Sequence, residues 1–189
     1  MRVRHNVASL VLAYLCVCVA SAEDTALRMG ESSYLQTGHI AYLLRDGAVR
    51  TLHLVKTTDG PPQQLFSRRI NASAGAPILV AEAVVLVDSS GKILKLDYAG
   101  KVLFEGALPN FSGASKFSGR LDPTRIYVQN TFDSKTGEGL RHRILIVDVS
   151  KKEPVVLASH PTGAVVKTFV SYPDELYLFG LDTVEKVKF

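Results

Sequence analysis

Short apolar runs separated by turn residues recur along most of this chain, and they constrain its fold more than any other feature. The clearest example lies at residues 76–108, with the sequence APILVAEAVVLVDSSGKILKLDYAGKVLFEGAL. Its four apolar runs are rich in Val, Ile and Leu, and they comprise residues 78–81, 84–87, 93–96 and 102–104. Runs of this length between Gly, Asp and Ser are typical of strands. Because the intervening turns are short, consecutive strands must pair antiparallel, and we expect a four-stranded meander.

The same pattern repeats before and after this segment. Its second run, residues 84–87, is apolar at every position, which suits a sheet covered on both faces by neighbouring sheets. The middle turns of the repeats contain Gly47, Gly91, Gly139 and Asp182, at spacings of 44, 48 and 43 residues. Repeats of about 40 to 50 residues are typical of β-propeller blades. A β-sandwich also consists of short strands with frequent turns and is the alternative, but the repeat favours the propeller.

Residues 76–108 also resemble one blade of a quinoprotein-type (PQQ-like) β-propeller. The matching features are the Val-rich second strand, Gly91-Lys92 before the third strand, Leu96-Asp97 at its end, and Gly100-Lys101-Val102-Leu103 before the bulky Phe104. The resemblance implies an all-β array of four-stranded antiparallel blades. Enzymes of this family hold pyrroloquinoline quinone between a Trp and two adjacent cysteines, with calcium nearby. This chain contains no Trp, so the resemblance implies a non-enzymatic member without a cofactor.

The first 22 residues have the pattern of a secretory signal peptide. Arg2 and Arg4 precede an apolar stretch, and Ala20-Ser21-Ala22 provides a small-x-small cleavage site. A membrane anchor is the alternative, but the apolar stretch is shorter than the ~20 residues that a spanning helix needs. We therefore expect cleavage after Ala22, a secreted or periplasmic protein, and no stable membrane span afterwards.

After the signal peptide, we expect a polar lead-in at residues 23–37 and a β-propeller-like domain at residues 38–189. The expected repeats comprise residues 38–75, 76–115, 116–163 and 164–189. They amount to about three and a half four-stranded blades, because the last repeat offers three strands. An incomplete ring leaves sheet edges unpaired. The sequence therefore predicts closure through Tyr34-Leu35, an oligomer, a partner, or blades from further sequence.

Composition restricts the classes of partner and chemistry. Cleavage would remove Cys16 and Cys18, so the remaining 167 residues would contain no cysteine, and 20 basic residues would face 18 acidic ones. The small positive charge is scattered in short pairs, which argues against nucleic acid as a partner. Without cysteine there are no disulfides, thiolate nucleophiles or thiolate metal sites.

No catalytic or metal-binding motif is recognisable in the sequence. His39, His53, His142 and His160 do not stand at metal-ligand spacing, and the acidic residues lie mainly at turns, where they cap the backbone. We therefore predict no catalytic, cofactor-binding or metal-binding residues. The alternative is a hydrolase or lyase with an acid-based site on a propeller face, assembled from Asp122, Asp133, Asp174 and His142.

These observations favour a non-catalytic binding or scaffold module that contacts a protein or a glycan through its loops. The long segment at residues 131–140 is the expected contact surface. The residues expected to contact the partner are Phe132, Asp133, Lys135, Glu138, Arg141 and Arg143. In a eukaryotic exported protein, Asn71 and Asn110 would also be N-glycosylation acceptors.

Overall fold

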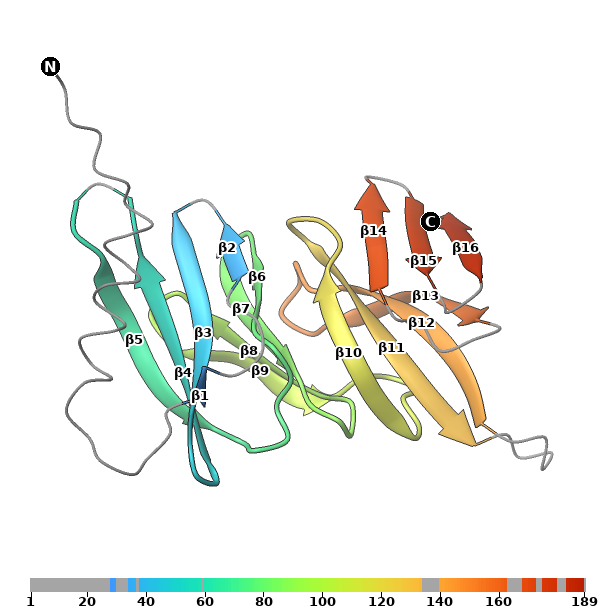
Figure 1. Cartoon of the computed structure of the whole chain (residues 1–189), viewed down its shortest axis with the longest axis horizontal. Coiled ribbons are helices and arrows are strands. Elements are labelled where there is room, and N and C mark those ends of the chain that lie inside the picture. Colours follow the sequence, from blue (N-terminus) through green and yellow to red (C-terminus); the bar gives the residue numbers. More distant parts are fainter. Residues whose placement is uncertain are drawn as a thin grey trace, which may run out of the picture.

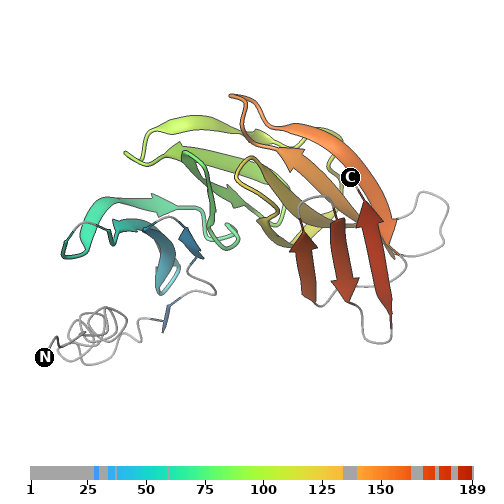
Figure 2. The same ribbon diagram turned by 90° about the horizontal axis from the view of Figure 1, so that it is seen from above.

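A computed structural model describes residues 28–29, 34–36, 38–58, 60–133, 140–162, 168–172, 175–179 and 183–188. Within these ranges all regular structure is β, arranged as four antiparallel sheets that follow one another along the chain (Figure 1). Viewed from above, the sheets stand in chain order along an arc (Figure 2). The predicted all-β fold of small stacked meanders is therefore confirmed, and the two large sheets of a sandwich are absent from the described part. No described segment is a helix that could cross a membrane.

The first sheet contains five strands in the order β1-β3-β4-β5, with β2 also paired to β3. The strands are β1 (Arg28–Met29), β2 (Tyr34–Gln36), β3 (His39–Asp46), β4 (Val49–Lys56) and β5 (Gln63–Ile70). The predicted hairpin at Asp46-Gly47 is present, and Gly47 has a φ of 54°. The suggested closure of the last sheet by Tyr34-Leu35 is wrong, because this segment pairs with β3 of the first sheet.

The second sheet is the predicted meander. Its strands are β6 (Ile78–Val80), β7 (Ala83–Val87), β8 (Lys92–Asp97) and β9 (Val102–Ala107), in that order. Every residue of β7 is buried, as its uniformly apolar sequence predicts. The turn between β7 and β8 is closed by Asp88, whose Oδ1 accepts hydrogen bonds from the amides of Ser90 and Lys92 at 2.8 and 2.9 Å.

The third sheet begins with a strand that the sequence pattern did not predict. Its strands are β10 (Ala114–Arg120), β11 (Arg125–Asp133), β12 (Leu140–Asp148) and β13 (Val155–Thr162). Residues 109–119 are rich in Ser, Gly and Asn, a composition typical of a connection. The ladder to β11 nevertheless makes residues 114–120 a strand. Gly119 lies so close to Tyr127 that an added Cβ would stand 2.1 Å from the tyrosine hydroxyl, so this polar strand depends on a close approach that only glycine permits.

The fourth sheet contains three strands in the described residues. They are β14 (Thr168–Tyr172), β15 (Glu175–Phe179) and β16 (Val184–Lys188). On β15 the buried residues alternate with partly exposed ones, so Leu176 and Leu178 face the third sheet while Tyr177 points away from it.

Apolar side chains fill the space between consecutive sheets. One cluster joins the first and second sheets and includes Leu43, Leu52, Leu54, Leu79, Val84, Leu86 and Leu96. A second joins the second and third sheets and includes Val85, Val87, Ile93, Ile126, Val128, Leu145 and Val147. A third joins the third and fourth sheets and includes Tyr127, Ile144, Ile146, Leu176, Leu178 and Val187. Among the described residues, no such cluster connects the fourth sheet back to the first.

Main-chain hydrogen bonds also join the second and third sheets. The amide of Ala81 donates to the carbonyl of Pro123 at 2.8 Å, and the amide of Ser115 donates to the carbonyl of Ser89 at 2.8 Å. Nearby, the buried Lys95 places its Nζ 2.8 Å from the carbonyl oxygen of Lys151. These bonds fix the two middle sheets relative to one another.

Candidate functional site

The predicted contact residues lie around the ends of β11 and β12. Phe132, Asp133, Arg141 and Arg143 belong to these two strands, whereas Lys135 and Glu138 lie outside the described residues. In the β11–β12 ladder, Phe132 stands opposite Arg141 and Asn130 stands opposite Arg143. Residues opposite one another share a face of the sheet, so Phe132, Arg141 and Arg143 are brought to one side of the third sheet.

Arg143 is held by contacts within the chain. Its Nε donates to Oδ1 of Asn130 at 2.7 Å, and its Nη2 donates to the carbonyl of Asn110 at 2.7 Å. Its guanidinium also lies 4.8 Å from the centre of the Phe132 ring, a cation–π geometry. Partial burial lowers the pKa of Arg143. The arginine therefore ties the start of β12 to the connection that precedes β10.

A row of polar side chains lies on the opposite face of the third sheet, toward the fourth. Thr131 Oγ1 and His142 Nδ1 are 2.9 Å apart. Gln129 and His160 both stand opposite Ile144. Gln129 is fully buried, and within the described part of the chain neither atom of its amide has a hydrogen-bond partner, nor has the buried Nε2 of His160. Sequence reasoning missed this row, because alternation along β11 does not reveal that a polar position is covered by another sheet.

Asp122 and His142 of the alternative catalytic set do not come together in the described residues. Asp122 precedes β11, and its carboxylate accepts hydrogen bonds from the amides of Thr124 and Arg125, both at 2.7 Å. His142 stands opposite Thr131, near the other end of the same strand. Six residues of strand separate the two places, roughly 20 Å at the rise of a β-strand. Asp174 lies outside the described residues. Asp122 therefore closes a turn.

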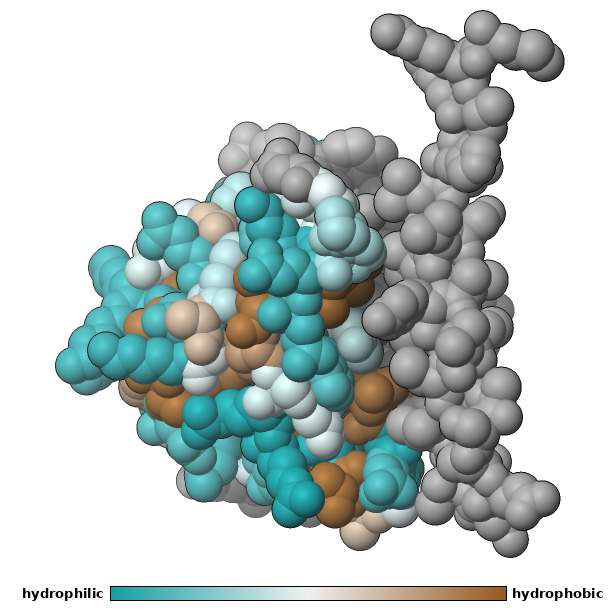
Figure 3. Space-filling view, turned by 90° about the vertical axis from the view of Figure 1, so that its left-hand side faces the viewer, coloured by the Kyte–Doolittle hydropathy of each residue, from teal (hydrophilic) through white to brown (hydrophobic). Residues whose placement is uncertain are grey.

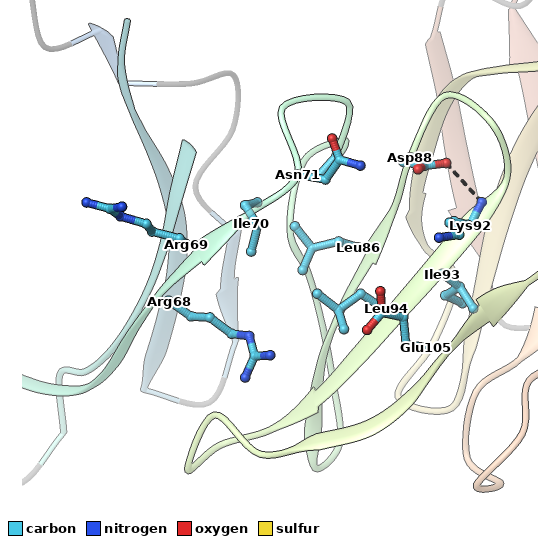
Figure 4. A pocket seen from close by; sticks show the side chains of 11 residues that line it. Arg68, Arg69, Ile70, Asn71, Leu86, Asp88, Lys92, Ile93, Leu94 and Glu105 are labelled. Atoms are coloured by element: carbon cyan, nitrogen blue, oxygen red, sulfur yellow. Dashed lines mark hydrogen bonds between the residues drawn. The ribbon is translucent and has the colours of Figure 1, made fainter. Parts of the chain in front are cut away.

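A cavity of about 250 Å³ lies between the first and second sheets (Figure 4). Its apolar lining includes Ile70 on β5, Leu86 on β7 and Leu94 on β8. Charged and polar groups surround this lining, and they are Arg68, Arg69, Asn71, Asp88, Lys92 and Glu105. In Figure 4, Arg68 extends from β5 toward β8, whereas Arg69 extends away from it. The cavity thus combines an apolar floor with a rim that carries both signs of charge.

Asp88 is the one buried carboxylate of this cavity, and it is committed to the turn before β8. Besides the two amides, Oδ1 accepts a hydrogen bond from the Ser90 hydroxyl at 2.7 Å, and Oδ2 accepts a longer one from Ser73 at 3.4 Å. Burial alone would raise the pKa of Asp88, but these hydrogen bonds outweigh burial and lower it. Asp88 is therefore ionised at neutral pH and is poorly suited to carry a proton for catalysis.

The exposed charged groups on the rim are less tied by hydrogen bonds than Asp88 is. Lys92 and Glu105 have exposed side chains, and Arg68 makes one long hydrogen bond, from Nη1 to the carbonyl of Gly100 at 3.3 Å. In the described part of the chain, no three His, Cys, Asp or Glu side chains gather as metal ligands would. This arrangement can bind an apolar group next to charged ones. Sequence reasoning missed this cavity, since Arg68-Arg69 and Lys92 look like ordinary solvated strand positions.

Comparisons with known proteins bear on the architecture. No protein-family model matches the sequence, and no curated protein sequence matches it. Among solved structures, the computationally designed Ika4 protein is similar with a TM-score of 0.60 and 13% identity over 89% of this chain and 94% of that one. The β-propeller domain of the Trilobed protease from Pyrococcus furiosus is similar with a TM-score of 0.53 and 10% identity, over 87% and 58%. The fold is that of a β-propeller.

A third comparison is with a much longer protein. The acylaminoacyl peptidase of Pyrococcus horikoshii matches 85% of this chain with a TM-score of 0.55 and 11% identity, but this chain spans only 32% of the peptidase. Identities this low show the shared fold alone. The resemblance to quinoprotein-type repeats is therefore supported as far as the β-propeller architecture, which quinoprotein-type blades share with other propellers.

Proposed function

We propose that this chain is an exported, non-catalytic β-propeller module that binds a segment of a partner protein. The observation that carries the proposal is the cavity between the first and second sheets. At about 250 Å³ it is smaller than the ~300–1,000 Å³ of typical small-molecule sites. It can accept one side chain or one sugar ring of a larger partner, but not a whole drug-sized ligand.

The chemistry of the cavity favours a protein over a glycan. Its floor is aliphatic, formed by side chains such as Ile70, Leu86 and Leu94. Arg68, Lys92 and Glu105 stand on the rim, where they can pair with charged side chains beside an inserted apolar one. An apolar centre inside a charged rim is the usual arrangement of protein–protein contacts. A glycan remains the second candidate partner from the sequence.

Export and the absence of catalysis belong to the same proposal. The signal-peptide pattern of residues 1–22 supports export, and the non-enzymatic quinoprotein-type repeat is the nearest resemblance for the second sheet. The predicted contact residues around residues 131–140 would extend the binding surface. A glycosidase and esterase screen tests the competing hydrolase function, since turnover of any substrate would support the latter.

Charge reversal on the rim tests the binding site. Peptides selected from a random display library and sugars on a glycan array would be tested against the protein, its double variant Arg68→Glu/Lys92→Glu, and Lys101→Glu. Lys101 is an exposed lysine between β8 and β9 of the second sheet, and it does not line the cavity. We expect selected peptides to bind the protein and Lys101→Glu, and to lose at least about tenfold in affinity for the double variant. Equal affinity of the selected peptides for the protein and for the double variant, or binding of sugars alone, would refute the proposal.

A replacement of residues 134–139 by a short Gly-Ser linker tests the second surface. We expect the fold to persist and the affinity for the selected peptides to fall. Unchanged affinity would show that residues around 131–140 take no part in binding.

A further inference from the structure

β13 is an edge strand with unusual composition. It is the last strand of the third sheet, and among the described strands it pairs only with β12. Its sequence, VVLASHPT, contains no Asp, Glu, Lys or Arg. Two of the exposed large apolar residues among the described ones lie on it, Val155 at 38% exposure and Leu157 at 53%. An edge strand offers unpaired main-chain amides and carbonyls, and apolar side chains beside them favour pairing with another chain.

The last strands of the other sheets are protected by charge. β5 contains Arg68 and Arg69, β9 contains Glu105, and β16 contains Glu185, Lys186 and Lys188. Figure 3 shows the side of the molecule on which β5 lies, and hydrophilic residues dominate it around small apolar areas. Charged side chains on an edge are a common protection against unwanted pairing. β13 lacks this protection.

The register shift between β12 and β13 does not distinguish this edge from the charged ones. The ladder between β12 and β13 shifts register between Ile146 and Val147, but equivalent shifts occur at β5 and β9. All three edges therefore share this feature. Pro161 removes one amide near the end of β13, which leaves residues 155–160 with their donors intact.

We propose that β13 pairs antiparallel with β13 of a second copy of this chain, across a two-fold axis near Leu157. The pairing joins two third sheets into one eight-stranded sheet and covers Leu157 with its own symmetry mate. Such an interface is isologous, so a charge near the axis would approach the same charge on its copy. β13 carries none, whereas a two-fold pairing of β5 or β16 centred on its charged residues would bring arginines or lysines together.

The flanking charges are compatible with this geometry. Lys151 and Lys152 lie in the exposed turn before β13. In an antiparallel pair centred on Leu157, this turn lies beside the far end of the partner strand. The two turns are then about 30 Å apart at the rise of a β-strand, so their lysines do not repel one another at physiological salt.

Light scattering after size-exclusion chromatography tests the proposal, with protein expressed from all 189 residues of the sequence. We expect a dimer at micromolar concentration. Leu157→Lys should weaken dimerisation by at least about tenfold, because two buried ammonium groups would meet at the axis. Val184→Lys is the matched control, since Val184 is 63% exposed on β16, and it should remain dimeric. A monomeric protein, a dimeric Leu157→Lys variant, or a monomeric Val184→Lys variant would each overturn the proposal.

Disulfide trapping gives an independent readout that does not depend on folding energies. In a Cys16→Ser/Cys18→Ser background, Leu157→Cys becomes the single cysteine. Across the proposed axis it faces its own copy and should form a covalent dimer under mild oxidation. Val184→Cys in the same background should stay monomeric on a denaturing gel. Equal cross-linking of the two variants would refute pairing through β13.

Discussion

Arg143 lies directly opposite Asn130 in the β11–β12 ladder, and its Nε donates a hydrogen bond to the Asn130 Oδ1 at 2.7 Å. Asn130 is fully buried, and its Nδ2 donates in turn to the carbonyl of Ser112 at 2.6 Å. The pair therefore connects β11, β12 and the segment before β10 through one continuous set of hydrogen bonds.

Loss of Arg143 should destabilise the protein. We expect Arg143→Ala to lower the free energy of unfolding by about 1–3 kcal/mol, because the buried Asn130 then loses a charged donor. Arg69→Ala is the control, since Arg69 is exposed, and it should change stability by less than about 0.5 kcal/mol. Urea denaturation measures both, and equal effects would show that the Arg143 network is not stabilising.

Replacement of Gln129 should instead stabilise the protein. Its buried amide has no hydrogen-bond partner among the described residues, so Gln129→Met should raise the free energy of unfolding by about 1–2 kcal/mol. The adjacent Asn130→Leu should lower it, because Asn130 forms hydrogen bonds with Ser112 and Arg143. Chemical denaturation of the two variants gives the comparison. A destabilised Gln129→Met variant would mean that the amide makes interactions essential to the third sheet.

Two glycines with positive φ should differ in their tolerance of alanine. An added Cβ at Gly91 would stand 2.2 Å from Cδ1 of Phe111, whereas nothing lies within 4 Å of one at Gly47. Gly47→Ala should cost about 1 kcal/mol from backbone strain alone. Gly91→Ala should cost at least about 3 kcal/mol, since the aromatic ring must also move. Thermal unfolding of both variants tests this, and similar costs would contradict the steric explanation.

Asp88 should make stability depend on pH in the acidic range. Its pKa is lower in the folded protein than in the unfolded chain. Its contribution is therefore complete above an unfolded pKa of about 3.9 and is lost as pH falls through the folded value. Asp88→Asn should be less stable than the unchanged protein by about 1–2 kcal/mol at pH 7, and the gap should narrow below about pH 4. Urea midpoints at both pH values measure this gap. A constant gap would show that the charge of Asp88 is immaterial.

The sequence predicted best where one side-chain pattern determines both a strand and its burial. β7 is apolar throughout and is buried throughout, and Asp46-Gly47 marks a tight hairpin that forms as expected. Such segments can be predicted from their local sequence, because strand propensity, turn chemistry and burial all indicate the same structure. β10 shows the opposite case. Its polar residues become a strand only because β11 pairs with them and Gly119 admits Tyr127.

The candidate site could be predicted only in part, for a related reason. Asp88 was expected to close a turn, and it does. Asp122, which was considered for the alternative catalytic site, also closes a turn. The cavity and the buried Gln129 each depend on two sheets that meet after the chain has folded. Neither the distance between Arg68 and Leu94 nor the cover over Gln129 is encoded in a local pattern of residues.

The hydrogen bonds from Ala81 to Pro123 and from Ser115 to Ser89 involve only groups that nearly every amino acid possesses. Substitutions at these four positions can therefore retain both main-chain hydrogen bonds between the middle blades. Of the twenty residue types, only proline would remove either donor.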